Sequence, residues 1–168
     1  QTLALYNAVA NDGKMVKPQF VQEIRDVNNS VKVFETQVIN PQIVKPQVVR
    51  EMQDILKNVM KKKGGTGHRL YSTDFSMAGK TGTAQKVGEN GKYMENNYIL
   101  SFIAFLNLEN PEYVVYIALD NPKGVTQYGG VASAPIARKV FENIISIYDI
   151  KPSEKGIPKQ YKWDDQIY

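Results

Sequence analysis

The sequence predicts an α+β domain in which helices cover an antiparallel sheet, and three observations support this class. Apolar residues recur at three- to four-residue spacing over several stretches, which is typical of amphipathic helices. Three β-rich runs follow one another with only short connections, and this close spacing favours an antiparallel meander. The order helix, hairpin, helix, meander, helix then predicts helices packed on one sheet.

The N-terminal elements are predicted from apolar spacing and turn residues. Residues 2–11 carry a broad apolar stripe followed by Gly13, which predicts the last turns of a helix that began upstream. Short β-rich runs at 20–27 and 31–36 flank Asn28-Asn29-Ser30 and predict a hairpin. A clear helix begins near Pro46 and ends at Gly64-Gly65.

The meander and the last helix occupy the second half of the chain. Strands are predicted at 76–87, 98–106 and 113–119, with a polar loop over 88–97. The last two strands are almost continuously apolar, which predicts that both faces of this sheet are covered. A loop over 120–130 leads to a helix from Pro135 to about Tyr148, and the tail is typical of a linker. We therefore expect one folded region over 1–148 and a linker over 149–168.

Composition excludes several classes of site. The chain of 168 residues has no Cys and a single His, so thiolate nucleophiles, disulfides and multi-His metal sites are excluded, and we expect neither metal nor cofactor. Net charge is +4, and the run Lys61-Lys62-Lys63 lies at a predicted helix end, where lysines complement the helix dipole. We expect no nucleic-acid partner. No apolar run approaches the roughly 18 residues of a membrane span.

The densest polar motif runs from Ala78 to Gln85. Gly79-Lys80-Thr81 resembles the end of a phosphate-binding P-loop, but Asp74 stands where that loop needs its first Gly, which excludes phosphate binding. A strand edge carrying Lys80 and Thr81 instead offers an ammonium, hydroxyls and unpaired backbone groups. Such an edge can bind an extended peptide that ends in a carboxylate. A surface strand with a glycine bulge accounts for the tripeptide equally well.

Four segments together resemble the class B penicillin-binding proteins, the monofunctional D,D-transpeptidases that cross-link peptidoglycan. These segments are residues 5–13 with Lys17-Pro18, 79–87, 120–124 and 128–135. Their order and spacing resemble the C-terminal part of the transpeptidase domain over residues 1–148, and they look closest to septal and sporulation-specific members from Gram-positive bacteria. The tail resembles linkers that continue into small extracellular modules.

The resemblance assigns roles to four residues of the predicted strand. It implies that Lys80 belongs to the active-site hydrogen-bond network and adds positive potential for a substrate carboxylate. It implies that the Thr81 and Thr83 hydroxyls contact that carboxylate, and that the Thr83 N–H is one oxyanion-hole donor. Gly82 would permit close approach of the substrate. Lys80 and Thr83 are therefore the predicted catalytic residues, and Thr81, Gly82 and Thr83 the predicted substrate contacts.

A second group of candidates precedes the last helix. Asp120, Tyr128, Gly129 and Gly130 are predicted to form a loop that borders the cleft, with Tyr128, Gly129 and Gly130 as substrate contacts. Ordinary turn chemistry is an equally weighted alternative. His68 has no second potential ligand near it in sequence, so a surface or turn histidine is favoured over a metal ligand or base.

The nucleophile of the family has no counterpart in this chain. No Ser is followed by Lys at the third position or by Asn at the second, so the S-x-x-K and S-x-N motifs are absent. We therefore expect this segment to be inactive without the N-terminal half of the same domain. The resemblance implies serine acylation by a stem peptide ending in D-Ala-D-Ala, followed by aminolysis, and acylation by β-lactams.

Two other functions stay open on sequence alone. One is a non-catalytic module that binds peptidoglycan stems or a partner, and the other is a serine β-lactamase or carboxypeptidase relative. The sequence upstream of Gln1 would distinguish all three. The favoured function implies a location on the extracytoplasmic face of the bacterial cell membrane, with attachment only through an N-terminal anchor outside this chain.

Overall fold

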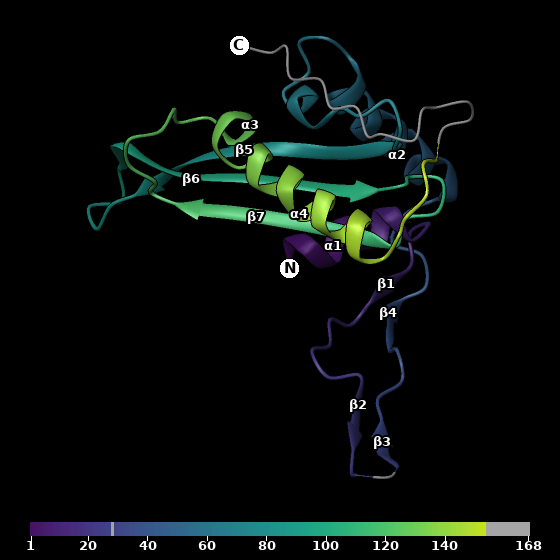
Figure 1. Cartoon of the computed structure of the whole chain (residues 1–168). Helices are drawn as coiled ribbons and strands as arrows, with labels where there is room; N and C mark the ends of the chain where they lie inside the picture. Colours follow the sequence, from purple (N-terminus) through teal and green to yellow (C-terminus); the bar gives the residue numbers. More distant parts are fainter. Residues whose placement is uncertain (28, 154–168) are drawn as a thin grey trace. The chain divides into compact units, whose positions relative to one another are not determined.

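The computed structural model describes residues 1–27 and 29–153, and the chain divides into two compact units, Gln1–Glu51 and Met52–Tyr168. In the first unit, helix α1 (Thr2–Ala10) is followed by two antiparallel ribbons (Figure 1). Strand β1 (Met15–Val16) pairs with β4 (Val38–Asn40), and β2 (Glu23–Arg25) pairs with β3 (Ser30–Val33). The predicted helix and hairpin are confirmed, although both hairpin strands are shorter than predicted.

The β1–β4 pair was not predicted from the sequence. Each of its strands has only two or three residues, which is too short for an alternating apolar pattern to be recognised. Asn28, in the predicted hairpin turn, lies outside the described residues.

The second unit contains the predicted meander. Strands β5 (Met77–Val87), β6 (Tyr93–Leu106) and β7 (Tyr113–Asp120) form an antiparallel sheet in the order β5-β6-β7. The start of β6 was predicted wrongly. It was expected at Tyr98, but the strand begins at Tyr93, which pairs with Val87 at the end of β5. The Gly88 N–H donates to the Lys92 carbonyl at 2.8 Å and closes this hairpin. The second half of the polar segment 88–97 is therefore strand.

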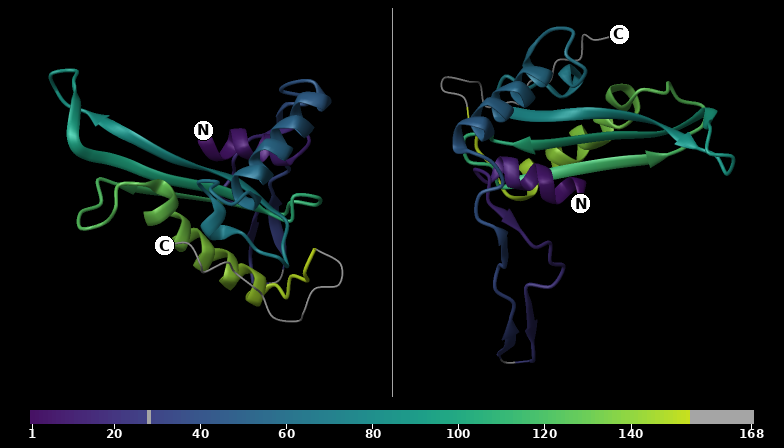
Figure 2. Two further views of the ribbon diagram at one scale, coloured as in Figure 1. Left: turned by 90° about the horizontal axis from the view of Figure 1, so that it is seen from above. Right: turned by 180° about the vertical axis from the view of Figure 1, so that it is seen from behind.

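Helix α4 (Ala134–Ile147) lies along one face of this sheet (Figure 2), which agrees with the predicted last helix. The short helices α3 (Gly129–Ala132) and η1 (His68–Leu70) were not predicted, because each is too short to show a periodic pattern. Helix α2 (Pro46–Lys61) begins at the predicted proline and includes residues of both units. Lys57 on α2 forms an ion pair with Glu109, N···O 2.9 Å, in the turn between β6 and β7.

The core of the second unit lies between α4 and the sheet. Its fully buried members include Phe102 of β6 and Phe141 of α4. Residues Phe102 to Leu106 are all buried, so both faces of β6 are covered over that stretch. For β7 the prediction of two covered faces is wrong. Val115 is its one buried residue and exposed positions alternate with half-buried ones after it, because α4 packs on only one face of β7.

The predicted linker is described only as far as Ser153. Ser153 donates its backbone N–H to the Asp74 carbonyl at 2.9 Å, and its hydroxyl accepts the Ser76 N–H at 2.7 Å. The linker's first residues are therefore attached to the segment that enters β5, and residues 154–168 lie outside the described residues. Within the described residues, no helix combines the length and apolar character that a membrane crossing needs.

Candidate active site

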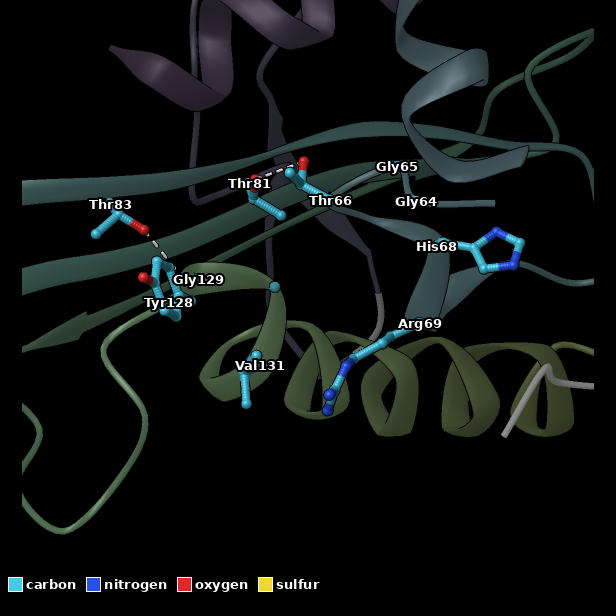
Figure 3. Close-up of a pocket in the computed structure, with 11 residues that line it drawn as sticks. Gly64, Gly65, Thr66, His68, Arg69, Thr81, Thr83, Tyr128, Gly129 and Val131 are labelled. Carbon is cyan, nitrogen blue, oxygen red and sulfur yellow. Dashed lines mark hydrogen bonds between the residues drawn. The ribbon is translucent and has the colours of Figure 1, made fainter. Parts of the chain in front are cut away.

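A cleft of about 280 Å³ opens beside the outer strand β5 of the sheet (Figure 3). Four segments of the second unit form it: the loop after α2, the 3₁₀ helix η1, strand β5 and the start of α3. The residues lining it are Gly64, Gly65, Thr66, His68, Arg69, Thr81, Thr83, Tyr128, Gly129, Gly130 and Val131. Six of the residues singled out in the sequence, His68 among them, thus meet in one place.

Thr81 and Thr83 both line the cleft because alternate residues of a strand share one face. The Thr81 hydroxyl donates to the Thr66 hydroxyl, Oγ1···Oγ1 2.9 Å. The Thr83 hydroxyl accepts the backbone N–H of Gly129 at 3.3 Å. Strand β5 is thereby joined to both neighbouring walls of the cleft through the two side chains that the sequence selected (Figure 3).

Lys80 and Gly82 are not among the lining residues. As alternate residues of β5 they face the opposite side of the sheet from Thr81 and Thr83. Lys80 is exposed, and its ammonium donates to the Thr81 carbonyl at 2.8 Å. A Cβ atom at position 82 would lie 2.4 Å from the Ser101 hydroxyl of β6, so a side chain there would require this hydroxyl to move.

Gly129 and Gly130 belong to helix α3, so their prediction as loop residues is wrong. Their role is steric. A Cβ atom at Gly129 would lie 2.4 Å from the carbonyl oxygens of both Gly82 and Ser101, and one at Gly130 would lie 2.3 Å from the Thr66 carbonyl. Neither distance is compatible with a side chain, so Gly129 lets α3 pack directly on the backbone of the sheet and Gly130 lets it pack on the backbone of the loop after α2. Tyr128 precedes α3, lines the cleft and is exposed.

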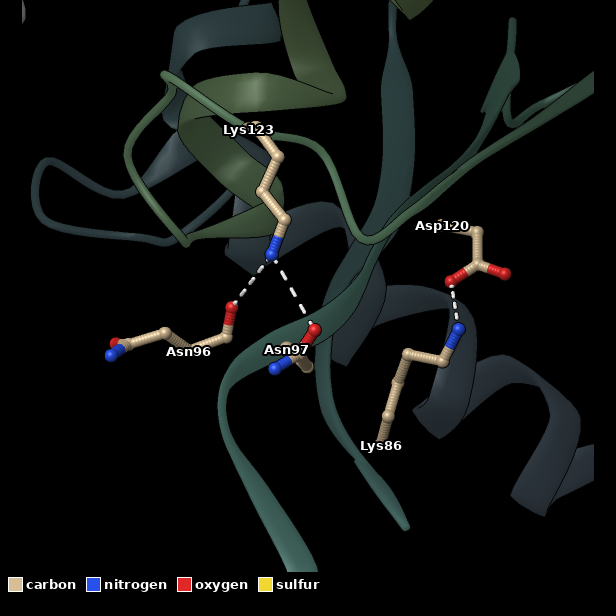
Figure 4. A network of polar contacts seen from close by, with 5 residues as sticks. All are labelled: Lys86, Asn96, Asn97, Asp120 and Lys123. Carbon is tan, nitrogen blue, oxygen red and sulfur yellow. Dashed lines mark hydrogen bonds and ion pairs between the residues drawn. The ribbon is translucent and has the colours of Figure 1, made fainter. Parts of the chain in front are cut away.

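Asp120 does not line the cleft, in contrast to its prediction as a bordering residue. It ends β7 and forms an ion pair with Lys86 of β5, N···O 2.6 Å (Figure 4). Nearby, the Lys123 ammonium lies 3.4 Å from the Asn96 carbonyl and from the Asn97 side-chain oxygen. These contacts connect the β5–β6 hairpin to the segment that leads from β7 to α3.

His68 lies on the 3₁₀ helix η1, which agrees with the favoured turn histidine, but it is buried rather than at the surface. Its Nδ1 donates to the Met60 carbonyl at 2.8 Å, and its ring stacks on Tyr71 with centroids 5.3 Å apart. Across the described ranges, no cluster of three or more His, Asp or Glu side chains could hold a metal ion.

Arg69 is the charged cleft residue that sequence reasoning missed, and Thr66, Gly64, Gly65 and Val131 were missed with it. Arg69 precedes β5 by only eight residues, but no pattern in the sequence predicts that it lines the same cleft as Thr81. The available signal was charge: residues 55–73 contain four lysines and Arg69 but no Asp or Glu.

The match to a family model decides the family. Residues 1–142 match the penicillin-binding protein transpeptidase domain. The chain belongs to this family. The family predicted from the four segments is confirmed.

Individual relatives support the same assignment. The chain is 35% identical over 166 residues to stage V sporulation protein D of Bacillus subtilis (strain 168), covering 98% of the chain and 25% of the relative. It is 30% identical over 158 residues to the peptidoglycan D,D-transpeptidase FtsI of Buchnera aphidicola subsp. Baizongia pistaciae, and the match covers 90% of the chain and 25% of that relative. The chain thus spans about a quarter of the length of these relatives.

Solved structures of the family confirm the α+β fold. Penicillin-binding protein 3 of Mycobacterium tuberculosis superimposes with a TM-score of 0.75 at 25% identity, covering 90% of this chain and 35% of that one. Its complex with ampicillin gives a TM-score of 0.73 at 25% identity, and the match covers 93% of this chain and 36% of that one. The present chain therefore corresponds to part of that fold.

Proposed function

We propose that the protein containing this chain is a serine-type D-Ala-D-Ala transpeptidase that cross-links peptidoglycan on the extracytoplasmic face of the cell membrane. The observation that carries the proposal is the placement of Thr81 and Thr83, which share one cleft at the free edge of β5. The relatives include a sporulation protein and an FtsI transpeptidase, which supports a role in the cell wall.

The proposed reaction is an acyl transfer. A serine hydroxyl from outside this chain attacks the carbonyl of the penultimate D-Ala, and the terminal D-Ala leaves with a proton on its amine. The amine of a neighbouring stem peptide then attacks the acyl-enzyme, forms the cross-link and releases the serine. A β-lactam would acylate the same serine through opening of its ring.

Strand β5 would contribute binding and electrostatic stabilisation to both steps. The Thr83 N–H would donate to the oxyanion as charge develops on the carbonyl oxygen, and loss of one such donor typically costs about 10²–10³ in rate. The Thr81 and Thr83 hydroxyls would hold the substrate carboxylate. Lys80, on the other face of β5, would join the hydrogen-bond network with residues that this chain does not contain.

The proposal includes inactivity of the isolated chain, because none of its serines has the S-x-x-K or S-x-N context. The test is covalent labelling with a fluorescent penicillin, measured on gels and by intact mass, for the full gene product and for this chain alone. We expect stoichiometric labelling of the full gene product and none of the chain. An adduct on the isolated chain would contradict its assigned inactivity.

Substitutions at β5 make the test specific. We expect Lys80→Ala to slow labelling of the full gene product at least tenfold, because an active-site cation is lost, while Lys92→Ala in the exposed hairpin leaves it unchanged. No labelling of the full gene product would favour the non-catalytic module instead. Rapid hydrolytic release of the label would favour a β-lactamase relative.

A further inference from the structure

The cleft contains a cation to which the proposed function assigns no role. Arg69 lines it together with Thr81 and Thr83, and its side chain extends from η1 across the front of helix α4 (Figure 3). Lys80, the expected source of positive potential, lies on the opposite face of β5 with its ammonium on the Thr81 carbonyl. Arg69 is therefore the one Arg or Lys side chain among the described residues that line the cleft with the two threonines.

The surroundings of Arg69 leave its charge available to a ligand. It is half-buried, and it forms no ion pair with any residue in 1–27 or 29–153. No lining residue of the cleft is acidic. The exposed lysines Lys61, Lys62 and Lys63 immediately precede the wall at Gly64 and add to the same positive field. The cleft is therefore electrostatically suited to an anion.

We propose that Arg69 is a specificity-determining residue that recognises the C-terminal carboxylate of the peptide reacting in this cleft, alongside Thr81 and Thr83. The inference rests on the proposed transpeptidase function. A guanidinium matches a carboxylate with two parallel N–H donors, and hydrogen bonds between charged partners are about twice as strong as neutral ones. Arg69 thus selects substrates with a free carboxylate over neutral analogues of the same shape.

The experiment compares two peptide thioesters that differ only at the end of the leaving group. One is a thioglycolate, which ends in a free carboxylate, and the other is the matching thioglycolamide, which ends in a neutral amide. Values of kcat/KM are measured for the full gene product and for its variants Arg69→Gln, Arg69→Lys and Arg138→Gln. Arg138 is the matched control, because it pairs with Glu142 on α4 at 3.0 Å and does not line the cleft.

We expect Arg69→Gln to lower kcat/KM for the thioglycolate about tenfold and to change that for the thioglycolamide less than twofold. Arg69→Lys should recover part of the preference, and Arg138→Gln should retain all of it. An equal loss with both thioesters would mean that Arg69 only supports the fold, and no loss with either would mean that it does not contact the substrate. Either result overturns the role of Arg69. The proposed transpeptidase function is still supported as long as the wild-type protein turns over the thioesters. Failure of the wild-type protein to react with either thioester and with penicillin would overturn both.

Discussion

The contact of Gly129 with the sheet leads to a quantitative prediction for Gly129→Ala. The new Cβ would lie 2.4 Å from two backbone oxygens, those of Gly82 and Ser101, whereas ordinary contacts begin near 3.4 Å. Neither oxygen can swing away as a side chain does, because both belong to paired residues of β5 and β6. Helix α3 must therefore move outward by about 1 Å, and overpacking of this kind typically costs about 1–3 kcal/mol.

Hydrogen exchange in the full gene product measures this cost locally. We expect amides of β5, β6 and α3 to lose protection by about one to two orders of magnitude in Gly129→Ala, since each tenfold corresponds to about 1.4 kcal/mol. Gly88→Ala is the matched control, because its nearest atoms at 3.2 and 3.4 Å belong to the movable side chains of Met94 and Asn90. Unchanged protection of β5 in Gly129→Ala would refute the steric role of this glycine.

Two further predictions concern the stability of the second unit. Phe141→Ala should destabilise it by about 3–5 kcal/mol in urea unfolding, because this core side chain is fully buried, while Ile136→Ala on the exposed side of α4 should cost under 1 kcal/mol; equal costs would contradict the assigned core. Burial opposes ionisation of Glu109 most strongly of the single causes, but the hydrogen bonds from Lys57, the Glu109 backbone and Ser76, together with the charge of Lys57, outweigh it and lower the pKa of this carboxyl. A lowered pKa stabilises the fold above the unfolded value near pH 4.3 and loses that effect as pH falls. Lys57→Gln should therefore cost about 0.2–1 kcal/mol at pH 7 and nothing below about pH 3, and a cost independent of pH would contradict the ion pair.

The larger elements of the fold could be predicted because each spans several repeats of its own period. Helix α2 begins at Pro46 and α4 begins beside Pro135, as the sequence indicates, and the three strands of the meander follow in the predicted order. The misassigned boundary at Tyr93 has a physical cause. Cross-strand pairing with Val87 extends β6 through residues whose polarity is typical of a loop.

The site was predictable only in part, because it combines local and long-range features. Thr81 and Thr83 could be selected from a contiguous motif. Arg69 could not, because its relevance arises from the fold that brings η1 beside β5. The face on which Lys80 lies follows from strand alternation once β5 is established, so the sequence alone predicts this placement.

The hydrogen bond between Thr81 and Thr66 determines what a ligand must replace. The Thr81 hydroxyl already has an acceptor at 2.9 Å, so binding exchanges one bond for another rather than adding a new one. A neutral amide exchanges like for like and gains almost nothing at this atom, whereas a carboxylate replaces a neutral acceptor with a charged one. Replacing the resting contact between the two threonines therefore favours an anion over a neutral group at this atom.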